Sequence, residues 1–448
     1  CRLLREDLRG ANERNRRRAG SRRDNRREGV HLKMKILLVG SGGREHALAL
    51  GLHADTFCTE LHVAPGNPGI AQFATCHELD IKDNLAITEL AKSLAIEFVV
   101  IGPEVPLVNG AADRLRAAGI KVFGPSKAAA QLEGSKNFAK EVMHDAGVPT
   151  AKSFTVGPVQ LEIESALDTF GAPYVVKDDG LAAGKGVVVT SDRKEAIAHA
   201  LQCERVVIEE YLAGPEISLF GISDGRNIIP MQPAQDFKRA LDGDEGPNTG
   251  GMGAYSPLPW APTDIEDDVY TQVLAPMIAE MAARGTPFIG LLYAGLALTD
   301  TGLKVIEFNA RFGDPETQVL IPRLQTPLAH LLYKAATDDL DDVALQWRDD
   351  SAVTVVLAAS GYPTDPKTGG EITNLPEVTD TQIFHAGTKS EGAKLLANGG
   401  RVLTVTGIGS DLTEARNQAY RAISQINLTN SFYRSDIALN ASVAEKGN

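Results

Sequence analysis

Short apolar runs that end at glycine or proline recur along the chain and predict the strands of an α/β protein. The first run, residues 36–39, leads into the glycine-rich turn GSGGREH and then into apolar residues at helical spacing. Three further runs end in similar turns: residues 61–63 before APGNPG, 98–101 before GPEVPL, and 122–123 before GPS. This alternation predicts an open parallel sheet with ligand sites at the carboxyl ends of its strands, although each turn alone is typical of plain strand-to-helix punctuation.

The middle of the chain predicts antiparallel hairpins instead. A helix at 132–148 leads to strands at 174–177 and 187–190, which flank the glycine loop DDGLAAGKG at 178–186. Because this loop joins two strands and Gly186 follows Lys185, it differs from a P-loop and favours a flap over phosphates, with a plain glycine hairpin as the alternative. A strand at 206–208, a long loop without regular structure at 235–257, and a hairpin of strands 289–298 and 304–308 follow. The hairpin is expected to place Glu307 on a central strand.

The last hundred residues predict a small, separate α/β unit. Strands are expected at 352–359, 382–385 and 401–407, and an amphipathic helix at 412–426. His385 is interpreted as a packing residue of this unit. The expected organisation is a tail at 1–33, an N-terminal α/β domain at 34–135, a central α+β domain at 136–345 and a C-terminal α/β domain at 350–443. The fold class is therefore α/β multidomain.

The net charge of −13 conceals a basic N-terminal segment. The first 33 residues are crowded with arginine and hold little that suits a core, so disorder is expected there. A nucleic-acid-binding arm, an organellar presequence and read-through upstream of a natural start at Met34 are three open interpretations. The third is favoured because the chain opens on Cys1 and Met34 directly precedes a clean strand. The acidic remainder argues against nucleic acid as a partner.

Apolar runs and cysteines bear on the cellular location. No apolar run reaches the roughly 20 residues that span a bilayer, so no membrane partner is expected. The four cysteines stand apart, without a CxxC pair or a histidine cluster at zinc spacing. A reducing, cytoplasmic location without structural zinc is the expectation.

The candidate chemistry centres on KVIEFNARFGDPETQ, residues 304–318. Glu307 and Asn309 are two positions apart, so on a strand both side chains point to the same face. Carboxylate and amide oxygens are ligands that Mg²⁺ accepts together with phosphates, and Arg311 adds a donor fork suited to phosphate. An isolated Glu-x-Asn is more typical of a strand that ends in a polar turn, so the other segments decide.

Those segments supply what an ATP site needs. Lys177 enters the glycine loop, whereas Lys136 near the predicted helix start either reaches a phosphate or is a solvated helix lysine. Glu209 and Glu210 either accompany a backbone edge for a purine or lie solvated on an edge strand. GxSxG is absent and no Ser or Cys nucleophile stands beside a His. The residues together predict an ATP-using enzyme.

In their order and spacing, the motifs resemble those of phosphoribosylamine–glycine ligases, a family of the ATP-grasp superfamily. The resemblance runs from Met34 to about Asp436 through GSGGREHALA, APGNPG, GPEVPL, LEGSKNFAK, VVKDDGLAAGKGVVV, GPNTGGMGAYSP, KVIEFNARFGDPETQ, FHAGT and GGRVLTVTG. It implies an N-terminal pre-ATP-grasp domain with an open parallel sheet, a central ATP-grasp α+β fold and a small C-terminal domain.

The resemblance also implies roles for the candidate residues. Binding of ATP is implied for Lys136, Lys177, Gly184, Lys185, Gly186, Glu209, Tyr211, Leu212 and Glu216. Binding of Mg²⁺ or Mn²⁺ is implied for Glu307 and Asn309, and catalytic roles for Asp236, Lys238 and Arg311. Binding of the other substrates is implied for Gly42, Gly43, Arg44, Asn67, Pro68, Gly69, Asn248, Thr249, Gly250, Gly251, Gly313 and Asp314.

The implied reaction joins glycine to 5-phosphoribosylamine through glycyl phosphate, with ATP as the energy source. It gives glycinamide ribonucleotide, ADP and phosphate in purine biosynthesis, and a monomer is expected to perform it. Phe237 departs from the family pattern, AQDHKR, which has His there, so no acid–base role is assigned to it. Another ATP-grasp ligase or carboxylase and a non-catalytic nucleotide-binding protein are the open alternatives.

Overall fold

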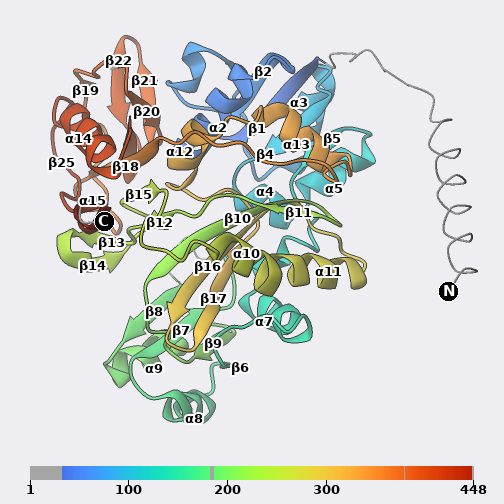
Figure 1. The fold of residues 1–448 in the computed structure, drawn as a ribbon, viewed down its shortest axis with the longest axis vertical. Coiled ribbons are helices and arrows are strands. Elements are labelled where there is room, and N and C mark those ends of the chain that lie inside the picture. The colour runs from blue at the N-terminus through green and yellow to red at the C-terminus, as the bar shows by residue number, and fades with distance from the viewer. Residues whose placement is uncertain (1–32, 182–185, 378, 446–448) are drawn as a thin grey trace, which may run out of the picture. The chain divides into compact units, whose positions relative to one another are not determined.

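The computed structural model describes residues 33–181, 186–377 and 379–445, and the described residues from Met34 onward form one compact unit. The first part of this unit forms a five-stranded, entirely parallel sheet in the order β3-β2-β1-β4-β5, as the alternating pattern predicts (Figure 1). The strands are β1 (Met34–Gly40), β2 (Cys58–Pro65), β3 (Thr75–Cys76), β4 (Phe98–Ile101) and β5 (Lys121–Phe123). The crossovers contain α2 (Gly43–Ala54), η1 (Ile70–Gln72), α3 (Asn84–Ser93), α4 (Glu104–Asn109) and α5 (Ala111–Ala117).

Two short helices lead out of this sheet where one long helix was expected. The prediction of a continuous helix over 132–148 is wrong, because the chain breaks at Ser135 between α6 (Gln131–Gly134) and α7 (Lys136–Asp145). Ser135 has extended backbone angles, and its hydroxyl accepts the Phe138 N–H as the N-cap of α7. The break places Lys136 at the first position of α7.

The middle of the chain forms two four-stranded sheets. The first, in the order β6-β9-β7-β8, is antiparallel and contains β6 (Ser153–Val156), β7 (Tyr174–Asp178), β8 (Val187–Thr190) and β9 (Val206–Glu209). The helices α8 (Gln160–Phe170) and α9 (Arg193–Ala200) pack on it. The second, in the order β11-β10-β16-β17, contains β10 (Glu216–Asp224), β11 (Ile228–Pro230), β16 (Ile289–Thr299) and β17 (Gly302–Asn309). Since β17 ends this order, the expectation of a central strand for Glu307 is wrong, although the hairpin itself is confirmed.

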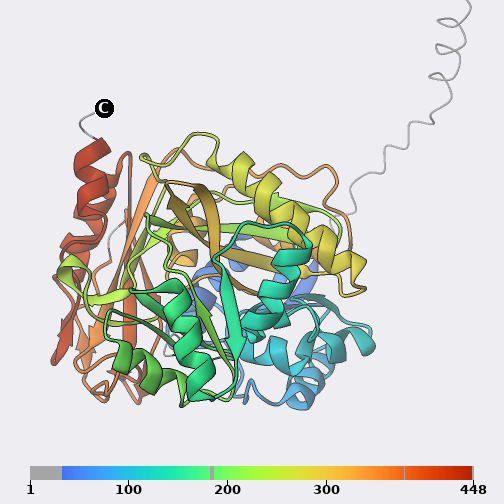
Figure 2. The same ribbon diagram turned by 90° about the horizontal axis from the view of Figure 1, so that it is seen from below.

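The third sheet joins distant parts of the chain. It contains β12 (Gln235–Asp236), β15 (Gly253–Ser256), β18 (Ser351–Ala359), β20 (Thr381–His385), β23 (Arg401–Gly409) and β25 (Ser431–Phe432). The expected separation of the C-terminal unit therefore does not extend to its sheet, because two strands from the middle of the chain pair into it. The helix α14 (Leu412–Ile423) packs on β18 and β23 and lies with α15 (Leu439–Glu445) along one side of the molecule (Figure 2).

The segment at 235–257 was expected to lack regular structure, and this too is wrong. Besides β12 and β15 it contains the hairpin β13 (Arg239–Leu241) and β14 (Glu245–Asn248), joined by η2 (Asp242–Asp244). Two other small pairs are β19 (Ile372–Thr373) with β24 (Asn427–Leu428), and β21 (Thr388–Glu391) with β22 (Lys394–Ala397).

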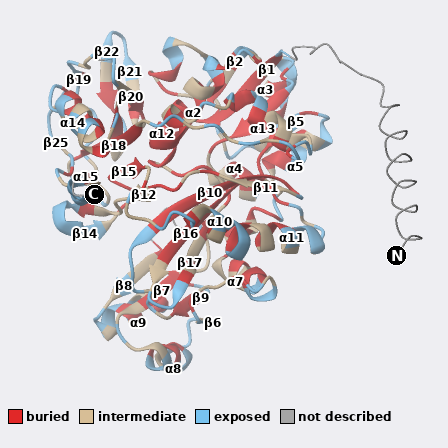
Figure 3. Ribbon diagram, in the orientation of Figure 1, coloured by how far each residue is buried: buried red, intermediate tan, exposed pale blue. Residues whose placement is uncertain are grey.

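The remaining helices cover the sheets. They are α10 (Ile265–Val269), η3 (Tyr270–Leu274), α11 (Ala275–Ala283), α12 (Thr317–Leu320), η4 (Ile321–Arg323) and α13 (Leu328–Ala336). Strands β1, β4, β10, β16 and β18 are buried along nearly their whole length, and the exposed residues gather on helices and hairpin ends (Figure 3). None of the described helices is both long and apolar enough to cross a bilayer.

Candidate active site

A cavity of about 840 Å³ is lined by residues of both middle sheets and extends into the N-terminal region, which contributes Arg44, Glu104, Leu132 and Glu133. This volume is in the range of small-molecule sites. Most of the predicted site residues line it: Arg44, Lys136, Lys177, Gly186, Glu209, Tyr211, Leu212, Glu216, Asp236, Lys238, Asn248, Thr249, Gly250, Glu307, Asn309, Arg311 and Asp314. The fold thus brings together side chains that are up to 270 positions apart, from Arg44 to Asp314.

One wall of the cavity is apolar. It is formed by side chains of α7, β7, β8, β9 and β17, namely Ala139, Met143, Val175, Val187, Val189, Val207, Ile306 and Phe308. Tyr211 and Leu212 follow β9, and within the described residues their backbone N–H and C=O groups have no backbone partner. An apolar slot beside free backbone groups suits a flat heterocycle with hydrogen-bonding edges.

Lysines also line the cavity, and Glu209 forms ion pairs with two of them. The Glu209 carboxylate is buried and forms an ion pair with Lys177 and another, at 2.7 Å, with Lys140. Lys177 Nζ also donates to the Ile306 carbonyl at 3.0 Å, which joins β7 to β17 across the cavity. The alternative of a solvated acid on an edge strand is therefore wrong for Glu209, because β9 is internal to its sheet. Burial lowers the pKa of Lys140, opposed by Glu209.

The glycine loop is tied to the start of α7. Lys136 Nζ donates to the Gly180 carbonyl at 2.9 Å, and the Ser135 hydroxyl donates to Asp179 Oδ1 at 3.0 Å. Lys136 is thus not a freely solvated helix lysine. Gly184 and Lys185, predicted to bind ATP, lie outside the described residues.

Around Asp236, carboxylates outnumber cations in this cavity. Lys238 Nζ forms an ion pair with Glu216 at 2.6 Å. Burial raises the pKa of Asp236 to about 7, although Lys238 opposes the shift. The nearby carboxylates of Glu316, Glu216 and Glu307 act in the same direction as burial. Negative charge without enough protein cations is what a site for a bound cation requires.

Glu307 and Asn309 are the ligands expected for such a cation. Both line the cavity, and within the described part of the chain neither side chain has a hydrogen-bond or ion-pair partner. Their carboxylate and amide oxygens are hard donors that fit Mg²⁺ or Mn²⁺. Among the described residues no three His, Cys, Asp or Glu side chains are grouped to hold a metal. The remaining ligands would therefore be oxygens of bound phosphates and water.

Arg311 is held between two carboxylates that the sequence analysis did not assign. Its Nε lies 3.3 Å from Glu104 Oε2, and its Nη2 lies 3.2 Å from Glu133 Oε1. Burial opposes the charged form, yet Glu133 and Glu104 raise the pKa of Arg311. Arg44 Nη2 lies 3.8 Å from the same oxygen of Glu104, so one carboxylate faces both arginines. The guanidinium of Arg311 is fixed and cationic before any ligand arrives.

The glycine turns of the N-terminal domain lie beside the cavity and do not line it. Gly42 donates its N–H to Glu45 Oε2 at 2.6 Å, and a Cβ on Gly42 would lie 3.8 Å from Asp314 Oδ2. The side-chain amide of Asn67 donates to the carbonyls of Ser41 and His385, both at 2.9 Å, and its Oδ1 accepts the Gly69 N–H. The further predicted residues Gly43, Pro68, Gly251 and Gly313 are likewise absent from the lining.

Several residues of the site were missed in the sequence analysis. Glu104 stands in GPEVPL, Glu133 in LEGSK, Lys140 in NFAKE, Glu316 in GDPETQ and Arg401 in GGRVL. Arg401 donates to the Asp314 carbonyl and forms an ion pair with its carboxylate, each at 2.7 Å. Each of these ionisable residues stands inside a recognised motif, which could have marked it as a candidate. The residue with which each interacts lies elsewhere in the chain, so the motif alone did not reveal its role.

The departure at Phe237 is a packing feature. Its ring lies under the Arg434 guanidinium, 4.9 Å from ring centroid to Cζ, and is absent from the cavity lining. His385 is buried, and burial lowers its pKa to about 4.

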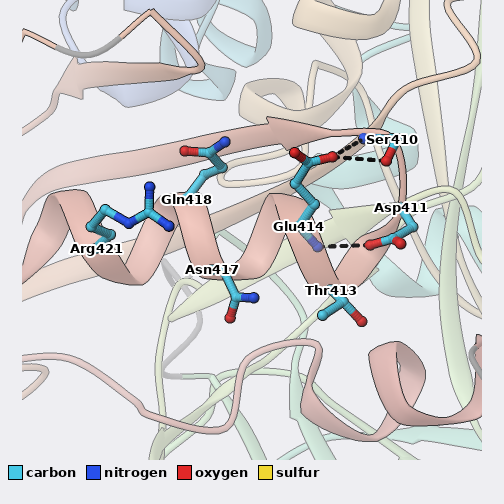
Figure 4. A pocket seen from close by; sticks show the side chains of 7 residues that line it. All are labelled: Ser410, Asp411, Thr413, Glu414, Asn417, Gln418 and Arg421. Atoms are coloured by element: carbon cyan, nitrogen blue, oxygen red, sulfur yellow. Dashed lines mark hydrogen bonds between the residues drawn. The ribbon is translucent and has the colours of Figure 1, made fainter.

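A second hollow, of about 420 Å³, lies over the outer face of α14 (Figure 4). Its polar groups serve the helix itself, because Asp411 accepts the Glu414 N–H as N-cap and Glu414 accepts from Ser410. It therefore offers no constellation comparable to the first cavity.

Comparison with known proteins gives the relationship. Three family descriptions match: "Phosphoribosylglycinamide synthetase, N domain" over residues 34–133, the "ATP-grasp (A) domain" over 134–317 and the "C domain" over 352–440. This chain belongs to the phosphoribosylglycinamide synthetase family.

Relatives of this family match nearly the whole described chain. The phosphoribosylamine–glycine ligase of Streptomyces coelicolor is 60% identical over 417 residues, which cover 92% of this chain and all of that protein. The one from Corynebacterium ammoniagenes is 54% identical over 424 residues, covering 92% of this chain and 99% of that protein. The crystal structure of the Thermotoga maritima phosphoribosylamine–glycine ligase superposes with a TM-score of 0.78 at 34% identity, covering 90% of this chain and all of that one.

Carboxylases share the fold at much lower identity. The biotin carboxylase domain of a Hydrogenobacter thermophilus 2-oxoglutarate carboxylase has a TM-score of 0.70 at 16% identity, covering 90% of this chain and 92% of that one. That likeness concerns the fold alone. The predicted α/β multidomain class and the ATP-grasp resemblance are thus confirmed.

Proposed function

We propose that this chain is a phosphoribosylamine–glycine ligase that uses ATP to join glycine to 5-phosphoribosylamine, giving glycinamide ribonucleotide, ADP and phosphate for purine biosynthesis. The observation that carries the proposal is the full-length match to ligases of that name at up to 60% identity. The cavity supports it independently, since it offers an apolar slot, lysines, paired arginines and a carboxylate-rich end in one space.

ATP occupies the cavity in this proposal with its purine against the apolar wall of β7, β8 and β9. Its phosphates extend past Lys177 and Lys136 toward Arg311, and Glu216 lies near its ribose hydroxyls. Glu307 and Asn309 would hold the Mg²⁺ or Mn²⁺, which supplies neutralisation of phosphate charge. The chain's own contribution is to position the reactants and to stabilise charge with fixed cations.

The reaction has two steps. A carboxylate oxygen of glycine attacks the γ-phosphorus, the bond to the β–γ bridging oxygen breaks, and ADP leaves. Arg311, held by Glu104 and Glu133, faces the charge on the transferring phosphoryl group. The amine nitrogen of 5-phosphoribosylamine then attacks the acyl carbon of glycyl phosphate, phosphate leaves, and the nitrogen loses a proton. Asp236, Lys238 and the segment 248–251 are assigned to glycine and the acyl phosphate.

The Arg44–Glu104–Arg311 row suggests where the two substrates meet. Arg44 stands at the start of α2, beside the glycine turns proposed for 5-phosphoribosylamine, and Glu104 lies between it and Arg311. The amine would therefore approach from the N-terminal sheet. The expected division at about 34–135, 136–345 and 350–443 remains part of the proposal, with the cavity at the junction of the first two parts.

ADP release tests the proposal. Purified protein with Mg²⁺ and ATP is given glycine alone, 5-phosphoribosylamine alone, or both. Rapid ADP release that needs both substrates, with a product of the mass of glycinamide ribonucleotide, is the expected result. Turnover driven by another acid would indicate a different ATP-grasp ligase or carboxylase, and binding of ATP without turnover would indicate a non-catalytic nucleotide-binding protein.

A further inference from the structure

The hairpin β13–β14 forms part of the cavity wall but has little core of its own. Lys238 precedes it and Asn248 ends it, and both line the cavity. Most of its residues are exposed, including Leu241 with 49% of its surface accessible. Isolated two-stranded hairpins are marginal in water, so the position of this one depends on what it contacts.

The segment Arg434 to Asp436 grips the end of the hairpin. Arg434 Nη1 donates to the Arg239 carbonyl at 3.1 Å and to Asp244 Oδ1 at 2.8 Å. Asp436 accepts the Gly243 N–H at 2.8 Å. The backbone N–H and hydroxyl of the intervening Ser435 donate to Asp242. In Figure 1 this hairpin lies next to α15.

The contacts of residues 434–436 with the hairpin are rigid because the Arg434 side chain is itself held in place. Its guanidinium donates to both oxygens of Asp436, each at 2.7 Å, and lies over the Phe237 ring. Only 1% of Arg434 is accessible. Tyr420 of α14 donates its hydroxyl to the Arg434 carbonyl at 2.7 Å, and Arg416 Nε donates to the Ile437 carbonyl at 3.0 Å. The hairpin is therefore braced against α14 through a buried, bidentate arginine.

We propose that Arg434 and Asp436 are positioning residues for the ligation: they hold β13–β14 so that Lys238 and Asn248 face the reacting groups, although neither touches the cavity. The inference rests on the proposed function of that cavity. A displacement of about 1 Å at a reacting centre can cost roughly 10²-fold in rate, so a loosened hairpin reduces turnover without any loss of a contact to substrate.

Arg434→Met tests the proposal, because it keeps the apolar stem and removes the fork. The side chain of Asp244 is 68% accessible and that of Asp436 is 23% accessible, so neither becomes a fully buried unpaired charge and the variant is expected to fold. Arg434→Lys restores the charge without the bidentate geometry. Arg421→Met, on the outer face of α14, is the matched control.

Three readouts are compared: kcat and KM for glycine and for ATP, the melting temperature, and hydrogen exchange of the amides at 239–248. For Arg434→Met we expect faster exchange confined to the hairpin and a fall of about 10–100-fold in kcat/KM for glycine. The KM for ATP should stay within about twofold of the wild-type value, because the apolar wall proposed for the purine is formed by other elements. The kcat/KM for glycine of Arg434→Lys should lie between those of Arg434→Met and the wild type.

Other outcomes overturn the proposal in distinguishable ways. Kinetics equal to those of Arg421→Met, with or without faster exchange in the hairpin, would show that its position does not matter to the reaction. Exchange raised throughout the chain with a lowered melting temperature would assign Arg434 to global stability. A wild-type protein that fails to release ADP with glycine and 5-phosphoribosylamine would overturn the proposed function, whereas an active wild type with an unaffected Arg434→Met would overturn the positioning role alone.

Discussion

Glu307 combines two properties that single it out among the carboxylates of the cavity. It lies two residues from Asn309 on the same face of β17, and its side chain forms no hydrogen bond or ion pair within the described residues. Glu209, Glu216 and Glu316, in contrast, are each engaged by a lysine or a hydroxyl group. A carboxylate left free in a polar cavity is one that a ligand can use.

Glu307→Gln removes the charge and keeps the shape. We expect glycine-dependent ADP formation to fall by about 10²–10³-fold, as for the loss of one stabilising group in a charged transition state. The melting temperature should be unchanged, because no ion pair is broken. Steady-state ADP release and a thermal melt measure the two effects.

Glu371→Gln provides the matched control. Glu371 forms a surface ion pair with Lys394 at 3.0 Å, and both side chains are largely exposed. Its loss should change neither turnover nor stability measurably. Near-normal turnover of Glu307→Gln alongside this control would refute the assignment of Glu307.

The sequence was sufficient to predict several site residues but not the residues with which they form ion pairs. The two-residue spacing of Glu307 and Asn309 was sufficient to place both on one face of a strand, because strand periodicity is local. The ion pairs of Glu209 with Lys140 and Lys177 were not predictable, since three different elements meet there. For the same reason Glu104 and Glu133 were quoted within motifs but not linked to Arg311.

At the scale of elements, local patterns predicted strands accurately and breaks poorly. Strands β4 and β8 have the bounds that their apolar runs indicate, whereas Ser135 divides a helix that apolar periodicity alone makes continuous. The hairpin β13–β14 was missed because its sequence is rich in Gly, Asp and Asn. Such a strand pair has no hydrophobic alternation, and its partner, the segment 434–436, is almost 200 positions away.

Gly251 allows the segment 248–251 to pack closely against the loop at 313–316. Its φ is +108°, and a Cβ there would lie 2.5 Å from Pro315 Cδ. Gly251→Ala should therefore displace the segment 248–251 from the cavity and lower kcat/KM by about 10-fold or more. Steady-state kinetics together with a thermal melt check this expectation.

Gly285→Ala separates backbone strain from the steric contact. Gly285 also has a positive φ, +74°, but a Cβ there meets nothing within 4 Å. This control should lose about 1–2 kcal/mol of stability and keep its turnover. Equal turnover of the two variants would show that the contact with Pro315 does not set the geometry of the site.

At the scale of the whole molecule, the N-terminal and C-terminal regions meet at a pair of buried histidines. His46 of α2 accepts the backbone N–H of His385 at 2.8 Å through Nδ1, so it must be neutral on that nitrogen. Burial, with a contribution from His385, lowers the pKa of His46 to about 3. Sequence reasoning did not predict this contact, which joins positions more than 300 apart, or the pairing of β15 with β18, which joins positions about 100 apart.

The His46 pKa makes stability depend on pH with a definite sign. The unfolded chain binds a proton at His46 below about pH 6.5, whereas the folded protein binds that proton only near pH 3. The free energy of unfolding therefore falls with decreasing pH in this window, by up to about 1.4 kcal/mol per pH unit for this group. His46→Gln keeps an acceptor without a titrating ring, so its melting temperature should fall less than that of wild type between pH 6 and pH 4. An equal fall in melting temperature of the two proteins between pH 6 and pH 4 would contradict a buried, neutral His46.

The proposed ligation depends on activation of glycine by phosphorylation, and an oxygen label reports on that step. Glycine carrying ¹⁸O in both carboxylate oxygens is ligated with ATP and 5-phosphoribosylamine, and the products are analysed by mass spectrometry. Attack of the carboxylate on the γ-phosphorus predicts one ¹⁸O in the released phosphate and one in the amide of glycinamide ribonucleotide. Unlabelled phosphate formed in step with the product would contradict a glycyl phosphate intermediate in this cavity.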